Sequence, residues 1–166
     1  MRLLKVLVLS SYEVDYVNSA TLKPLNYLKY LGVRATTFYF DRESHLPHLE
    51  TLIVKNDRSV MLRGCFGEME QLRHVEISDA EFDKQGLFEG SSKLENLRIL
   101  KNIVGFPIDR ADVLSRRCPN LQQLHVEFWE SRAESFCLTL ENLTYPASNT
   151  SRLLSGPLLC TCTLKF

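Results

Sequence analysis

Hydrophobic residues recur along the chain in one short phrase, Leu-x-x-Leu-x-x-Leu-x-Val, which is complete at residues 25–33 and 46–54. Within the phrase the spacing changes from three to two, as between Leu52 and Val54, and a period of two is typical of a strand. An amphipathic helix would instead continue the i, i+3, i+4, i+7 spacing. Six copies run in phase, with anchor residues 21 to 25 positions apart: Leu7, Leu31, Leu52, Val75, Leu100 and Leu124.

This period lies in the range of leucine-rich repeats, roughly 20 to 29 residues. We therefore predict an α/β solenoid, a leucine-rich-repeat horseshoe. Short parallel strands should line its concave face, and loops or short helices should cover its convex face. One repeat cannot bury its apolar side alone, so stability has to come from stacked neighbours.

Two segments are expected to depart from the regular repeat. Asn102 occupies the place of the second apolar strand residue in the fifth repeat, which predicts a short or distorted strand there. Residues 109–112 have the composition of a helix start, and Pro119 should end that helix.

The repeats extend over residues 1–143, as about six units and a partial seventh, and residues 144–166 form a non-repeat tail. Pro146 stands where the seventh anchor should fall, and proline cannot donate a hydrogen bond to a strand ladder. The sequence leaves open whether the tail is ordered. Because the repeat has no polar cap at either end, we expect the chain to be a fragment of a longer protein or a chain with an altered C-terminus.

Composition narrows the class of protein. The 20 Lys and Arg balance the 20 Asp and Glu, without the basic surplus that is usual in nucleic-acid-binding proteins. No apolar run approaches the 18 residues of a membrane span. Five scattered cysteines, an odd number, favour reduced thiols and a cytoplasmic protein.

No motif for catalysis or cofactor binding stands out. The sequence contains no phosphate-binding loop, no Gly-x-Gly-x-x-Gly and no Gly-x-Ser-x-Gly elbow. His45 and His48 have Glu43 and Glu50 nearby but lie around Pro47 in an expected loop, without a third ligand on a rigid element. We therefore expect no enzyme activity, no cofactor and no metal site in this chain.

The strand residues between the leucines are the candidates for a functional surface. They should project from the concave face, where a mixture of charged, aromatic and apolar side chains suits protein recognition. The alternative is that they are simply solvated strand residues. The candidate protein-binding residues are Tyr30, Arg34, Thr51, Ile53, Lys55, His74, Glu76, Ile99, Lys101, Gln123, His125 and Glu127.

The amino-acid sequences of the repeats resemble those of plant intracellular immune receptors. The phrases at 4–11, 25–31, 46–54, 69–75 and 118–124 are similar to coiled-coil, nucleotide-binding, leucine-rich-repeat (NLR) proteins of the late-blight-resistance-like class of nightshade plants. This resemblance covers about residues 1–143. It implies that the repeats sense pathogen effectors, or a guarded host protein, and restrain the receptor's own nucleotide-binding domain. ADP or ATP would bind only in that domain, which this chain lacks.

Two functions remain as hypotheses. The first is a protein-recognition segment of a plant immune receptor in the defence response, which includes localised cell death. The second is a stand-alone leucine-rich-repeat adaptor for protein binding, such as substrate recognition in a ubiquitin-ligase complex. An F-box-like helical segment before the repeats would favour the adaptor, and the chain shows none.

Overall fold

The computed structural model describes residues 3–40, 46–57, 60–64, 66, 69–82, 93–104, 111–129 and 159–165. Within these ranges, only the backbone is described for residues 79–82, 104, 111–112, 115, 126–129 and 159–165. The elements are β1 (Val6–Asn18), the 3-10 helix η1 (Ser19–Leu25), β2 (Tyr30–Tyr39), β3 (Thr51–Lys55), β4 (Val60–Arg63), β5 (His74–Phe82), β6 (Ile99–Val104), α1 (Ala111–Arg117), β7 (Gln123–Trp129) and β8 (Leu159–Lys165).

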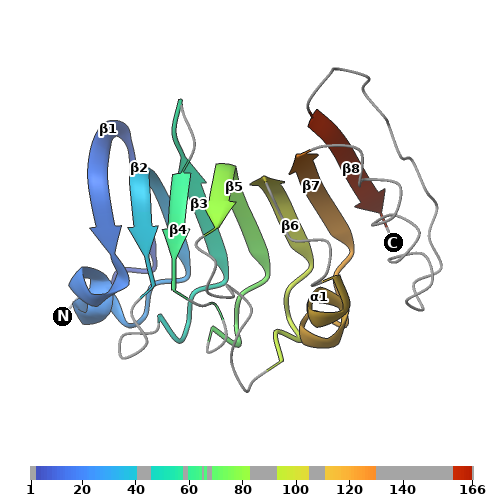
Figure 1. Ribbon diagram of the computed structural model, residues 1–166. Helices are drawn as coiled ribbons and strands as arrows, with labels where there is room; N and C mark the ends of the chain where they lie inside the picture. Colours follow the sequence, from blue (N-terminus) through green and yellow to red (C-terminus); the bar gives the residue numbers. More distant parts are fainter. Residues whose placement is uncertain are drawn as a thin grey trace.

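The strands form one eight-stranded sheet in the order β1-β2-β3-β5-β6-β7-β8, and β4 pairs with both β2 and β5 (Figure 1). All pairs are parallel except β7 with β8, which is antiparallel. Successive repeats therefore lie side by side along a solenoid. The predicted leucine-rich-repeat solenoid is confirmed.

The six anchor residues stand opposite one another across the sheet. Leu7 pairs with Leu31, Leu31 with Leu52, Leu52 with Val75, and the ladder continues through Leu100 to Leu124. Leu31, Leu52, Val75 and Leu100 are fully buried. The stacking predicted from the spacing of these residues is thus present at every step.

A backbone relay joins each repeat to the next at the start of its strand. The carbonyl of Lys5 accepts hydrogen bonds from the amides of Lys29 and Tyr30 at 2.8 and 3.0 Å. The same pair of bonds recurs at the carbonyls of Lys29, Glu50, Arg73 and Arg98. Each Leu-x-x-Leu phrase before the relay is a tight turn, since the amide of its second leucine donates to the carbonyl of its first, as between Leu49 and Leu46. The turn directs both leucines into the core.

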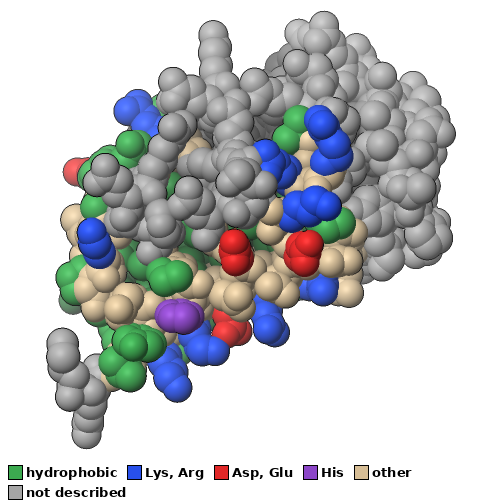
Figure 2. Space-filling view, turned by 90° about the horizontal axis from the view of Figure 1, so that it is seen from below, with side chains coloured by type: hydrophobic (Ala, Val, Ile, Leu, Met, Phe, Trp, Pro, Cys, Tyr) green, Lys and Arg blue, Asp and Glu red, His purple; other side chains and the backbone are tan. Residues whose placement is uncertain are grey.

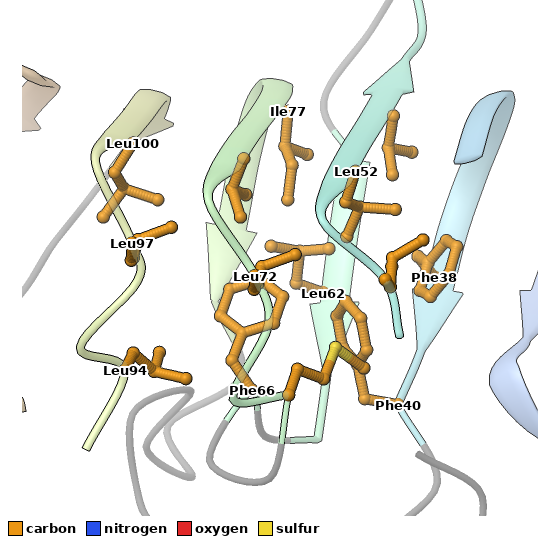
Figure 3. Close-up of a cluster of buried hydrophobic side chains, with 14 of the residues drawn as sticks. Phe38, Phe40, Leu52, Leu62, Phe66, Leu72, Ile77, Leu94, Leu97 and Leu100 are labelled. Carbon is orange, nitrogen blue, oxygen red and sulfur yellow. The ribbon is translucent and has the colours of Figure 1, made fainter. Parts of the chain in front are cut away.

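A second row of strand pairs, which the repeat pattern did not predict, lies on the return path of the first repeats. The late part of β1 pairs with the late part of β2, and β4 pairs with β2 and β5. Apolar residues of this row, such as Phe38 and Leu62, are buried against the leucines of the first row (Figure 3). In these repeats the convex side is therefore made partly of strands; among the described residues, the helical return segments are η1 before β2 and α1 before β7.

Gly64 permits a close approach of two return segments. The amide of Phe40 donates to the carbonyl of Arg63 at 2.8 Å, and the rings of Phe40 and Phe66 pack edge to face with centroids 4.7 Å apart. Gly64 has φ +96°, and a Cβ on this residue would lie 2.1 Å from the Phe40 carbonyl oxygen. Only glycine satisfies both the backbone angle and the contact.

The predicted irregularity at Asn102 is present. Asn102 has φ +62°, the left-handed conformation that asparagine tolerates better than most residues. The pairing of β6 with β7 shifts between Leu100 and Ile103, so Ile103 rather than Asn102 enters the core and is fully buried. The predicted helix is also present and ends at Arg117, before Pro119; Asp109 lies outside the described residues.

The two ends of the sheet differ. At the β1 end, residues whose counterparts are buried in later repeats remain exposed: Leu4 is 43% and Leu9 39% exposed. At the other end β8, within the predicted tail, covers the edge of β7 along seven residue pairs. No helix in the described part of the chain is long and apolar enough to span a membrane.

Replacing a buried core leucine should cost far more than replacing its counterpart at the open end. We expect Leu52→Ala to lower the free energy of unfolding by about 3 kcal/mol, in the range for buried leucines. Leu9→Ala should cost less than about 1 kcal/mol, because its side chain is already partly in water. Urea unfolding followed by circular dichroism measures both, and equal losses would contradict the stacking account.

Gly64→Ala should destabilise the protein by about 2 kcal/mol or more, because it adds both backbone strain and a clash with Phe40. Gly32→Ala is the matched control. Its added Cβ would lie 3.2 Å from the flexible Tyr30 side chain and in ordinary contact with Val8 at 3.8 Å. A Gly64→Ala variant as stable as the control would show that the turn can relax.

Candidate functional site

The concave-face candidates fall into rows that run across neighbouring strands of the sheet. Tyr30, Thr51, His74, Ile99 and Gln123 are successive partners in the sheet register, and they continue from Val6 on β1. A second row runs from Val8 through Gly32, Ile53, Glu76 and Lys101. Arg34 and Lys55 pair beyond it.

Of these candidates, Lys55 is exposed, and the others with described side chains are partly buried. His125 follows Leu124 on β7, and Glu127 also lies on this strand, but its side chain is outside the described residues. The register thus places the predicted residues with described side chains on one surface.

Gly32 shapes the part of this surface nearest β1. A Cβ on Gly32 would lie 3.2 Å from Cε1 of Tyr30 and 3.8 Å from Cγ1 of Val8. The Tyr30 ring therefore lies beside the bare backbone of Gly32 and makes an aromatic surface there. Val8 is 54% exposed, so the surface remains apolar as far as the edge strand. The residues predicted from the sequence did not include Gly32. Its alternation with Tyr30 and Arg34, which were both predicted to project from the concave face, could have identified it.

Charged side chains occupy the centre of the face. Glu76 carries one carboxylate oxygen 3.8 Å from Nζ of Lys55 and the other 3.7 Å from Nε2 of His74. The Glu76 side chain is 25% exposed and that of Lys55 is 62% exposed. Glu76 is consequently half-enclosed, and a partner can still reach Lys55.

A second ion pair lies beside this centre, in the middle of β2. Arg34 donates a hydrogen bond to Asp57 and also lies 4.0 Å from a carboxylate oxygen of Glu13. Neither acidic residue was among the sequence candidates. Asp57 follows β3 and Glu13 follows an irregularity in β1, so only the sheet register reveals that they meet Arg34.

His74 is the titratable group of this face with a clear shift. Burial lowers the pKa of His74 below its ordinary value of 6.5; the nearby Glu76 opposes this shift and Lys101 adds to it. The imidazole is therefore neutral at pH 7, and Nε2 is buried without a hydrogen-bond partner among the described atoms.

The described residues offer little for catalysis. They contain no group of three or more His, Cys, Asp or Glu side chains that could hold a metal ion. His48 stacks on Tyr27, with ring centroids 5.6 Å apart, and His45 lies outside the described residues. Burial raises the pKa of the Cys118 thiol to about 12, so this cysteine stays protonated and is a poor nucleophile.

Stacked parallel strands with a polar, half-buried concave face define a leucine-rich-repeat protein. Late blight resistance protein homolog R1B-12 of Solanum demissum is 32% identical in an alignment covering 74% of this chain and 9% of that protein. Homolog R1B-16 of the same species is 32% identical over 76% of the chain and 10% of its own length, and late blight resistance protein R1-A is 32% identical over 62% and 8%.

The chain is a leucine-rich-repeat relative of the late blight resistance proteins, which confirms the resemblance noted in its repeats. It spans about a tenth of the length of these relatives. No protein-family model matches the chain, and no solved structure gives a significant match.

Acidification should destabilise the protein through His74. Since the native pKa of His74 is lowered, the unfolded state binds more protons once the pH falls below about 6.5, and the free energy of unfolding falls with it. One proton accounts for at most about 1.4 kcal/mol per pH unit. We expect His74→Gln to lose less stability than the unmodified chain between pH 7.5 and 5.5 in urea unfolding. If both proteins lost the same free energy of unfolding, the pH dependence would come from groups other than His74.

Proposed function

We propose that this chain is a protein-recognition segment of a plant intracellular immune receptor, located in the cytoplasm. Its concave face would sense a pathogen effector, or a host protein that the effector modifies, in the defence response. The observation that carries the proposal is the similarity to late blight resistance proteins over about three quarters of the chain. Activity as an enzyme and binding of a cofactor form no part of this proposal.

The concave face supplies a physical basis for recognition. An aromatic and apolar part around Tyr30 and Ile53 adjoins a charged part around Lys55 and Glu76. Aromatic anchors contribute much of the binding energy in protein interfaces, and surrounding charges contribute specificity. A partner with an apolar anchor and charges complementary to Lys55 and Glu76 would fit.

The same face would serve autoinhibition if it bound the receptor's own nucleotide-binding domain. An effector then activates the receptor only if it binds better to the released state than to the inhibited one. The adaptor hypothesis uses the same surface and differs in the consequence of binding, which would be delivery of the bound protein to a ligase. No observation on this chain favours the adaptor.

A binding screen with charge-reversed variants tests the proposed function. The purified chain is screened by split luciferase against secreted proteins of a nightshade pathogen, and a hit is expected. Lys55→Glu and Glu76→Lys should each weaken that hit at least about tenfold, because each places a like charge opposite the partner. Arg63→Glu, on β4 in the return path and away from the concave strands, is the control and should change nothing.

The double variant Lys55→Glu/Glu76→Lys keeps an oppositely charged pair at this site and shows whether the single variants simply unfold. A hit that every concave variant binds equally well would refute the concave face as the binding surface. A screen without any hit would refute direct sensing of secreted proteins.

A further inference from the structure

The turns that precede the strands form a second surface, separate from the concave face. At equivalent places in successive turns stand Tyr27, His48, Gln71, Asn96 and Asn120. Side-chain amides tie two of these turns to the preceding repeat: Asn96 donates to the carbonyl of Glu70 and Asn120 to that of Glu95, both at 2.9 Å. The turns are thereby held in a fixed row. We call this surface the turn edge (Figure 2).

The turn edge carries the excess positive charge of the described side chains. Its cations are Lys5, Lys23, Lys29, Arg73, Lys93, Arg98, Arg116 and Arg117, and its anions are Glu50, Glu70 and Glu95. The other described side chains are balanced, with Arg34, Lys55, Arg63 and Lys101 against Glu13, Asp15, Asp57 and Glu76. The zero net charge of the whole chain gives no sign of this excess among the described side chains.

The described acidic side chains of the turn edge neutralise only part of this charge. Lys29 and Arg73 share one carboxylate: Lys29 donates a hydrogen bond to Glu50, and Nε of Arg73 lies 4.0 Å from its other oxygen. The Lys29 hydrogen bond is the main reason that the pKa of Glu50 is below its ordinary value. Lys5, Lys23 and Lys93 are exposed and have no ion pair within the described part of the chain.

An aromatic stack lies on the same edge. The rings of Tyr27 and His48 are nearly parallel, with an interplanar angle of 12°, and Tyr27 is 46% exposed. These exposed flat rings offer a contact for an aromatic or apolar side chain. Glu50, Glu70 and Glu95, in contrast, interrupt the positive charge in successive repeats, which would oppose a continuous phosphate backbone.

We propose that the turn edge is a second protein-binding surface, whose partner is an acidic segment with an aromatic or large apolar residue. The acidic side chains of the partner would lie along the unpaired lysines, and its apolar residue would lie on the Tyr27–His48 stack. This inference is independent of the proposed function, because it uses neither the concave strands nor any effector.

A synthetic acidic peptide tests the proposal on the full 166-residue chain. The probe is a fluorescent peptide in which Asp and Glu surround one Phe. Its matched control carries Asn and Gln in place of the acids. Unlabelled acidic peptide and a single-stranded DNA of equal length are the two competitors. Fluorescence anisotropy should show binding of the acidic peptide only, weakening at least about tenfold when the salt is raised from low to physiological concentration.

Variants then locate the binding. Lys5→Glu/Lys93→Glu should weaken the acidic peptide about tenfold, and Tyr27→Ala should weaken it severalfold, while circular dichroism shows unchanged folding. Lys55→Glu on the concave face is the matched control and should leave the affinity unchanged. The proposal is overturned if the neutral peptide binds equally well, if Lys55→Glu is as damaging as the turn-edge variants, or if DNA competes as strongly as the acidic peptide.

Discussion

The in-register stacking of one leucine position supports everything else in this molecule. Leu31, Leu52, Val75 and Leu100 are buried only because a neighbouring repeat lies on each side. The backbone relay at Lys29, Glu50 and Arg73 fixes the same register, since each carbonyl there accepts two amides of the next repeat. Burying one such side chain is worth roughly 1.5–3 kcal/mol, so the register is set by a sum over repeats rather than by a single contact.

The functional surfaces inherit their geometry from this register. A residue next to an anchor, such as Glu76, is placed opposite Ile53 and Lys101 because Val75 is opposite Leu52 and Leu100. Repeats of unequal length still meet in register on the strands, and the differences in length are taken up by the return segments. The concave face and the turn edge therefore take their spacing from the stacked repeats, and side-chain chemistry on them can change without altering the backbone.

Features repeated along the chain could be predicted from the sequence, and features that depend on contacts between repeats could not. The six anchors and the irregularity at Asn102 are visible as a pattern and its interruption. The strands of the return path escaped prediction because Phe38 and Leu62 belong to no common phrase. The contact of Arg34 with Asp57 spans two repeats, and so does the tie from Asn96 to Glu70. Both contacts become apparent only when the register of separate segments is known.

The difference between the two ends of the sheet bears on how the solenoid opens. Leu9 is 39% exposed whereas its partner Val33 is 3% exposed, so the first repeat contributes less burial than those inside. At the other end, the backbone of β7 is paired on both sides, by β6 and by β8. Each repeat of a stack is stabilised by its neighbours, so the isolated 166-residue chain should open first at the repeat of β1. In that isolated chain the Tyr30 side of the concave face should be more mobile than the side near Lys101, and a repeat stacked on β1 would remove this difference.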